Sequence, residues 1–193
     1  MGRETAEREF DDPVLGETTL GRLFEDSAER HAEAVAQQYK GGIYERSLAG
    51  TAVPAVEAGE YGTLTYGEMR HVVRRLAAGF RDLGVTAGDR VGIFSDSRME
   101  WAHADFGLLA AGGVVTTVYR SSSPEQVRYL LEDPGATGVV AEDPECIKRI
   151  AEVEGDLDLE FIVSMDDPRG HGRRDDVYSL ADVYERGDEV FDR

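Results

Sequence analysis

Apolar residues recur at helical spacing in one well-defined segment near the middle of the chain. Thr65 and Glu68 form a capping box at its start, and Gly84 follows its last apolar residue. Seven apolar positions lie three or four residues apart on one stripe: Met69, Val72, Val73, Leu76, Ala77, Phe80 and Leu83. The charged positions are expected mostly on the opposite, solvated face: Arg70, Arg74, Arg75, Arg81 and Asp82. The pattern predicts an amphipathic helix.

Weaker patterns precede this helix. A helix is predicted to begin at Thr19, because apolar residues follow it at helical spacing. Gly41-Gly42 is a turn signal between two β-like runs. The predicted segments are a flexible lead-in (1–17), the helix from Thr19, a strand (34–39), a second strand of a hairpin (43–51) and a surface loop (53–62).

Beyond residue 89, short apolar runs alternate with helical patterns. Strands are predicted at 91–95, 114–119, 137–141 and 159–164. Helices are predicted from a capping box at 97–100 to Ala111, from Ser123, from Asp143, and at 179–186 after a polar loop at 166–176. Crossovers of this length join parallel strands. The fold class is therefore α/β, with βαβ units over 89–164 and a mostly parallel sheet covered by helices.

Charge changes the picture of the surface. The chain has 39 acidic and 21 basic residues, a net charge of −18, and its lysines are Lys40 and Lys148. A carboxylate surface with few lysines suits a protein that is soluble in molar salt, so we interpret the chain as halophilic, with haloarchaeal origin expected. An ordinary acidic protein is the alternative. Non-specific nucleic-acid binding is disfavoured, because phosphates would be repelled.

The N-terminal residues and the lack of a long apolar run lead us to expect a cytoplasmic protein. The first twelve residues are polar, without the apolar core of a secretory signal, and no apolar run is long enough to span a membrane. Cys146 is the one cysteine, which excludes an internal disulfide and a multi-cysteine metal site. We expect it to be a half-buried helix residue.

Phosphate-binding chemistry would lie beyond the carboxyl ends of the strands. No G-x-G-x-x-G follows a strand, and no P-loop motif occurs. The candidate anion cradle is Arg120-Ser121-Ser122-Ser123, which combines a guanidinium, hydroxyls and a helix start. Because Ser123 is already explained as an N-cap, ordinary helix-start chemistry is the favoured interpretation.

Other chemistry-bearing residues form no recognisable constellation. His31, His71, His103 and His171 lack metal-pair spacing and are expected at the surface or its boundary. Trp101 and Phe106 are expected in the core. Three acidic residues lie near one predicted helix start, where the helix dipole favours negative charge: Asp96, Glu100 and Asp105. We therefore predict no catalytic, cofactor-binding or metal-binding residue in this chain.

Several short motifs together resemble the adenylate-forming superfamily. The segment 64–69 (LTYGEM) resembles its first core motif, and 83–91 resembles its lead into the first sheet strand. Glu100-Trp101 with 108–114 (LLAAGGV) resembles the second core motif. Val118-Tyr119 followed by 122–127 (SSPEQV) resembles the long-chain fatty-acid–CoA ligase branch. The resemblance covers roughly residues 18–164, and 18–193 would be an incomplete N-terminal domain.

This resemblance implies an AMP-forming acyl-CoA synthetase, in which a fatty acid and ATP give an acyl-adenylate, and coenzyme A displaces AMP with Mg²⁺ as cofactor. The family's phosphate loop, adenine-binding segment, ribose-binding Asp and catalytic lysine lie downstream of the matched region. The resemblance therefore implies no catalytic residue here, and the chain is expected to be inactive alone and to bind none of these cofactors. Arg120 departs from the family, which more often has a small residue or proline there.

Three interpretations remain open. The chain is a partial synthetase, a subunit of a split synthetase whose partner is the missing half, or a stand-alone α/β module that binds a small ligand. The first is favoured, and it predicts exposed apolar helix and sheet surface. Specificity for another acyl or aryl substrate also stays open.

Overall fold

A parallel five-stranded sheet lies at the centre of the computed structural model, which describes residues 18–168 and 177–191. The strands follow the order β4-β3-β5-β6-β7, and every neighbouring pair is parallel. Their bounds are β3 (Arg90–Phe94), β4 (Val114–Val118), β5 (Ala136–Ala141), β6 (Phe161–Ser164) and β7 (Val177–Ser179). The predicted lead-in at 1–17, most of the polar loop and His171 lie outside the described residues.

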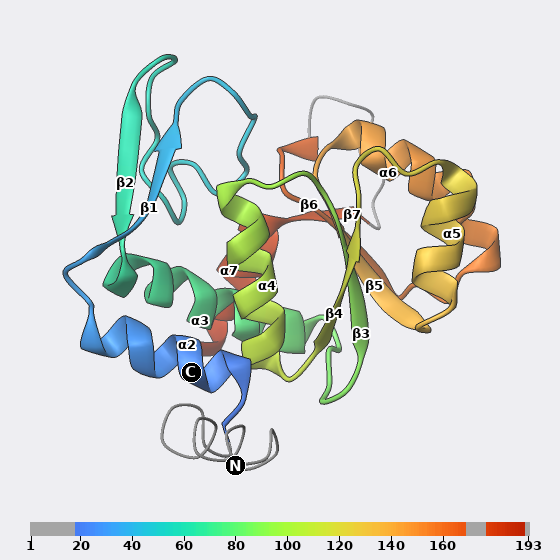
Figure 1. Ribbon diagram of the computed structural model, residues 1–193, viewed down its shortest axis with the longest axis horizontal. Helices are drawn as coiled ribbons and strands as arrows, with labels where there is room; N and C mark the ends of the chain where they lie inside the picture. The colour runs from blue at the N-terminus through green and yellow to red at the C-terminus, as the bar shows by residue number, and fades with distance from the viewer. Residues whose placement is uncertain (1–17, 169–176, 192–193) are drawn as a thin grey trace, which may run out of the picture.

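Helices cover both faces of the sheet and make an α/β/α sandwich (Figure 1). One layer holds α3 (Tyr66–Asp82), α4 (Met99–Ala111) and α7 (Leu180–Phe191), and the other holds α5 (Pro124–Glu132) and α6 (Pro144–Ala151). A 3-10 turn, η1 (Glu154–Asp156), precedes β6. The two faces of the sheet bury separate apolar clusters, so the strands are apolar on both sides. The predicted α/β class with a parallel sheet is confirmed.

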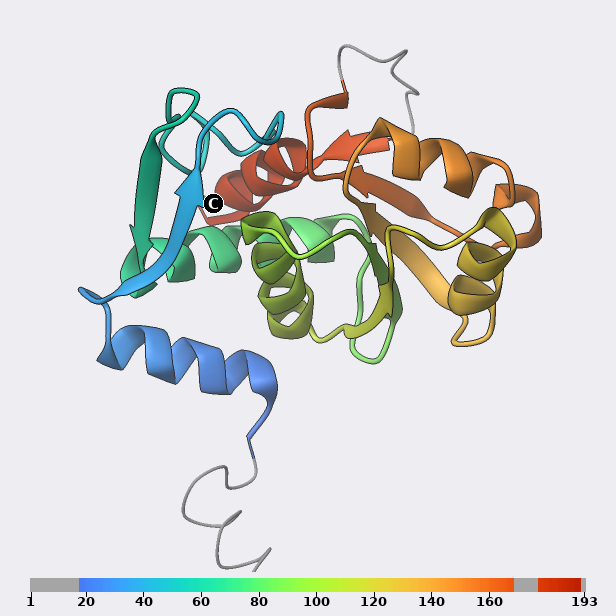
Figure 2. The same ribbon diagram turned by 45° about the horizontal axis from the view of Figure 1, so that its top comes forward.

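Two further parts lie outside this sandwich. Helix α2 (Leu20–Arg30) packs on α3 and α4 through Phe24 and Ala28, and Figure 2 shows it as the outermost element. Strands β1 (Val35–Lys40) and β2 (Tyr61–Thr65) form an antiparallel pair beside the start of α3. Among the described residues, no helix is both long and apolar enough to cross a membrane.

The hairpin prediction at 43–51 is wrong. The partner of β1 is β2, which includes the last two residues of the predicted surface loop. The segment 43–51 instead forms turns at the end of β6, where the Ser47 N–H donates to the Met165 carbonyl at 3.1 Å. Leu48 there is fully buried. A contact with a residue far along the chain determines the conformation of this segment, and the alternation of apolar and polar residues within it does not indicate that contact.

Helix starts were predicted well, with one error. The capping boxes of α3 and α5 are both present, and Asp143 caps α6. The box predicted at 97–100 is wrong, because the N-cap of α4 is Arg98 and no side chain caps it. Near the end of the chain, β7 was not predicted, and α7 runs five residues beyond the predicted end at Arg186.

Candidate functional site

The carboxyl end of β3 is the place where a doubly wound sheet would bind a ligand. The chain passes from β3 to β4 on one side and then crosses to β5 on the other side, with α4 and α5 on opposite faces of the sheet. Connections that diverge in this way leave a crevice beyond the strand ends. The residues at this crevice follow β3, β4 and β5.

A carboxylate of the protein itself occupies the hydrogen-bond donors at this crevice. Glu142, which follows β5, is 5% exposed. Its Oε2 accepts the Asp96 N–H at 2.7 Å and the Ser95 hydroxyl at 3.1 Å. These two donors, at the end of β3, are therefore already paired within the chain.

Arg120, the cation of the predicted anion cradle, is neutralised by neighbouring carboxylates. Its Nη2 donates to Asp143 Oδ2 at 2.6 Å, and its Nε lies 3.3 Å from Glu142 Oε1. The hydrogen bond with Asp143 raises the pKa of the Arg120 guanidinium. Burial raises the Asp143 pKa, but the bonds from Arg120 and the Cys146 N–H outweigh it and hold that pKa below its usual value. Ser123 caps α5 as predicted.

A second charged cluster is buried between the β1–β2 connection, the start of α4 and the end of β6. We call Arg46, Arg98, Glu100 and Asp166 the buried ion network. Glu100, fully buried, pairs with Arg46 and Arg98 at 2.7 Å each, and Arg98 also pairs with Asp166 at 2.7 Å. The Tyr44 ring centroid lies 4.0 Å from the Arg98 guanidinium carbon. Two positive and two negative charges balance away from water.

Burial and ion pairing shift the pKa of Asp166, a member of this network, in opposite directions. Burial raises the pKa of Asp166 above its usual value, although the hydrogen bond from Arg98 lowers it. From the sequence, Glu100 was expected in a capping box and Arg46 in a strand. No local pattern could reveal the network, because Arg46 and Asp166 are brought together only by the fold.

The remaining predicted residues are spread over the molecule. His31 and His71 are exposed as predicted, but His103 is fully buried, and the surface prediction for it is wrong. Burial lowers the pKa of His103 to about 4, because charging the imidazole away from water is costly, although nearby Glu100 raises it. The half-buried prediction for Cys146 is also wrong. Its side chain is fully buried, which raises the thiol pKa to about 12.

The aromatic residues of α4 were predicted in the core, and in the structure they are only half-buried. Trp101 is half-buried and packs against the cluster of the α3–α4–α7 face. Phe106 is half-buried too, and its ring stacks on Phe24 of α2 with centroids 4.3 Å apart. Both side chains therefore contribute to packing between elements. Asp105 is half-buried as well, and burial raises its pKa.

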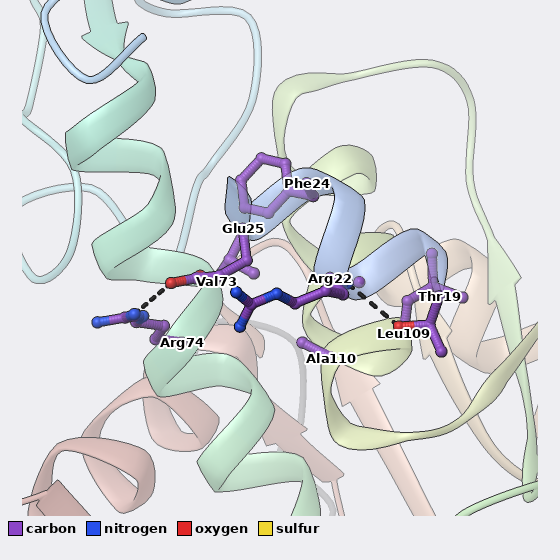
Figure 3. A pocket seen from close by; sticks show the side chains of 9 residues that line it. Thr19, Arg22, Phe24, Glu25, Val73, Arg74, Leu109 and Ala110 are labelled. Atoms are coloured by element: carbon purple, nitrogen blue, oxygen red, sulfur yellow. Dashed lines mark hydrogen bonds and ion pairs between the residues drawn. The ribbon is translucent and has the colours of Figure 1, made fainter. Parts of the chain in front are cut away.

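A small hollow lies between α2, α3 and α4 (Figure 3). Glu25 pairs there with Arg74 of α3, as Figure 3 shows, and also with Arg70 of the same helix. Burial raises the Glu25 pKa, but the hydrogen bonds from both arginines lower it more. Most of the charged positions of this helix lie on a solvated face as predicted, because Arg74, Arg81 and Asp82 are exposed. Some of these side chains also join α3 to its neighbours, as Arg75 does by pairing with Asp188 of α7.

Metal binding has no support in the described ranges. Within residues 18–168 and 177–191, no group of three or more His, Cys, Asp or Glu side chains could hold a metal ion. Of the acidic residues near the start of α4, Glu100 is engaged in ion pairs with Arg46 and Arg98.

Comparison with known proteins connects this architecture to a family. The family model for the AMP-binding enzyme matches residues 24–183. A long-chain-fatty-acid–CoA ligase of Mycobacterium bovis is 42% identical over 99 residues, which are 51% of this chain and 16% of that protein. A long-chain-fatty-acid–CoA ligase of Rattus norvegicus is 30% identical over 128 residues, 66% of this chain and 18% of that protein. The matched part thus spans less than a fifth of these relatives.

Solved structures share the fold. The adenylation domain of a carboxylate reductase from Mycobacterium chelonae superposes with a TM-score of 0.73 at 20% identity, over 91% of this chain and 30% of that one. A long-chain-fatty-acid–CoA ligase from Archaeoglobus fulgidus gives 0.65 at 18% identity, over 88% and 30%. With its family match over most of its length, the chain belongs to the AMP-binding enzyme family.

Proposed function

We propose that this chain is the N-terminal portion of a long-chain fatty-acid–CoA ligase. The observation that carries the proposal is the 42% identity to such a ligase over 99 residues, inside the region that the family model matches. The whole enzyme would join a fatty acid to coenzyme A in two steps. ATP would first give an acyl-adenylate and pyrophosphate, and the thiol of coenzyme A would then displace AMP, with Mg²⁺ screening the phosphates.

Within this enzyme, residues 18–193 act as an incomplete N-terminal domain, a scaffold that is inactive alone. The carboxyl edge of the sheet supports this proposal, because the Ser95 hydroxyl and the Asp96 N–H there already donate to Glu142. Arg120, the cation nearest to that carboxylate, is already paired with two carboxylates. In this proposal these residues position the fold and take no part in the reaction.

The surface and compartment are part of the same proposal. We propose a cytoplasmic, halophilic enzyme, because a net charge of −18 with two lysines favours a hydrated acidic surface over a membrane or nucleic-acid partner. The folded chain would keep its stability in molar salt, where this charge is screened.

Palmitate-dependent exchange of pyrophosphate into ATP tests the proposal. The pure 193-residue chain is expected to show none, while the full-length Mycobacterium bovis relative serves as the positive control for the assay. Measurable exchange by the chain would refute its role as an inactive scaffold. A rise in melting temperature with ATP would instead favour a stand-alone ligand-binding module.

The length of the open reading frame separates the two remaining alternatives. An in-frame continuation beyond the Arg193 codon into a Ser/Thr/Gly-rich phosphate loop would support a partial synthetase. A stop codon followed by a neighbouring gene for the missing half would support a split synthetase.

A further inference from the structure

Helix α4 is apolar around most of its circumference, and every one of its residues is buried or half-buried. One side packs on α3 and the sheet, through residues such as Ala104 and Leu108. A second side packs on α2, through Ala102 and Phe106. A surface helix usually carries charged residues on its free side, whereas a helix that is apolar all round is normally covered all round. The composition of α4 is therefore that of a helix with a third covered side.

This third side is a row of three side chains spaced four residues apart, Trp101, Asp105 and Leu109, which we call the open row of α4. Residues at this spacing are neighbours along one face of a helix. All three are half-buried. Asp105, in the middle, is thus a carboxylate with an apolar side chain one turn away on either side.

Asp105 makes no hydrogen bond or ion pair through its side chain with any residue that the structure describes. Burial raises its pKa above the usual value, and no neighbouring cation lowers it. The other acidic residue of α4, Glu100, is instead paired with two arginines. A carboxylate that is partly removed from water is costly unless a positive charge pairs with it. A basic side chain is therefore the group that would stabilise the open row.

We propose that the open row of α4 packs against a segment from the remaining part of the ligase, and that a basic side chain of this segment pairs with Asp105. The inference rests on the proposed function, in which this chain is the N-terminal portion of a longer enzyme. The matched parts are 16% and 18% of the two ligases compared above, so most of such an enzyme lies outside this chain.

The open row also indicates the chemistry of the partner segment. The segment is apolar on both sides of its cation, because Trp101 and Leu109 flank Asp105. An arginine suits the position best, since a guanidinium can pair with the carboxylate and also stack on the Trp101 ring.

A second copy of this chain fits the open row less well. A twofold axis on the row would bring the Asp105 carboxylates of the two copies together, and like charges that approach each other away from water are unfavourable. Each copy also carries a net charge of −18, which adds repulsion over a longer range. Charge complementarity therefore favours a segment that supplies a cation.

The substitution Asp105→Asn tests the proposal by the sign of its effect. In the isolated 193-residue chain it removes a half-buried charge without a partner, so the melting temperature is expected to rise by about 2–4 °C. In the full-length ligase, read through from the same gene or co-expressed with its missing half, it leaves the partner cation unpaired. The melting temperature is there expected to fall. Asp156→Asn, at an exposed position of η1 on the α5–α6 face, is the matched control and should change neither protein.

Two results of this experiment would overturn the proposal. A rise in both proteins would mean that Asp105 has no cation in the whole enzyme. A fall in the isolated chain would mean that the carboxylate already has a partner within these 193 residues.

Carboxyl labelling is the second measurement. Carbodiimide with glycine ethyl ester, followed by mass spectrometry of peptides, is expected to modify Asp105 at least ~10-fold more slowly in the full-length ligase than in the isolated chain. Asp156 should react at similar rates in both. Equal rates at Asp105 would show that the open row stays uncovered. Protection that grows with the concentration of the isolated chain would show that a second copy covers it, and would also refute the proposal.

Palmitate-dependent exchange of pyrophosphate, measured on the same full-length preparation, separates this inference from the proposed function. Normal exchange with equal labelling rates at Asp105 refutes the inference alone. Protection of Asp105 without any exchange refutes the proposed activity and leaves the packing of the open row supported.

Discussion

The substitution Glu100→Gln tests whether the buried ion network holds the β1–β2 connection onto the sheet. Glu100 is fully buried and pairs with Arg46 and Arg98, whose side chains are 7% and 0% exposed. Glutamine keeps the volume but removes the charge, so Asp166 alone remains to balance two arginines. Removing one partner of a buried pair costs about 3–5 kcal/mol.

We expect Glu100→Gln to lower the free energy of unfolding by about 3 kcal/mol, and the melting temperature by about 6–12 °C for a chain of this length. Urea titration followed by circular dichroism measures the change, with the dependence on urea concentration unchanged if the denatured state is unaffected. Glu29→Gln is the control, because that carboxylate is 67% exposed in its pair with Arg70. The Glu29→Gln variant is expected to lose less than about 1 kcal/mol of unfolding free energy.

The result that would refute this reasoning is a Glu100→Gln variant as stable as the control. That outcome would mean that water or rearranged side chains compensate the arginines, and that the network does not hold the connection in place. A hydrophobic triple variant, Arg46→Met, Arg98→Met and Glu100→Leu, gives a further check. Because no charge stays unpaired except that of Asp166, it is expected to lose less stability than the three single substitutions together.

Four further predictions follow from single features. The His103 pKa of about 4 lies below the ordinary value of 6.5. The stability that comes from the neutral, buried imidazole is therefore complete above pH 6.5, and about 3 kcal/mol of it is lost as pH falls from 6.5 through 4. His103→Gln should flatten this part of a curve of unfolding free energy against pH. Gly79→Ala would place a Cβ 1.9 Å from the Val183 carbonyl oxygen, so urea titration should show a loss of about 1–3 kcal/mol, whereas Gly155→Ala enters open space and should not. Cys146 should react with a thiol reagent only as fast as the chain unfolds. Raising KCl from 0.1 to 2 M should raise the melting temperature, because it screens the net charge of −18.

Local patterns predicted most helices, because a helix start depends on neighbouring residues. The Thr65 box and the Ser123 N-cap bring donor and acceptor together within four residues, and both were found as predicted. The capping-box prediction failed at 97–100, because the Glu100 carboxylate pairs with Arg98 and Arg46 and does not cap the helix N-terminus. The local sequence does not show that a distant arginine competes for this carboxylate.

The candidate site shows the same division. Ligand chemistry was expected beyond the carboxyl ends of the strands, and Ser95, Arg120 and Glu142 lie together at that end of the sheet. Their hydrogen-bond pairing was not predicted. From the sequence, Arg120 was a candidate anion-binding cation, with ordinary helix-start chemistry favoured for its loop, and the structure has its guanidinium paired with Asp143 and Glu142. Ion pairing depends on the direction in which each side chain points, and the spacing of residues along the chain does not show that direction.

The sequence by itself determined the α/β class, the alternation of strands and helices, most helix starts and the acidic character of the surface. These properties follow from periodicity, from capping and from composition, which are local or additive. Only the tertiary structure decided the partner of β1, the course of residues 43–51, the burial of His103 and the buried ion network. Each of these depends on contacts between residues far apart in the chain, where a charge or a backbone group finds its partner only after the layers have packed.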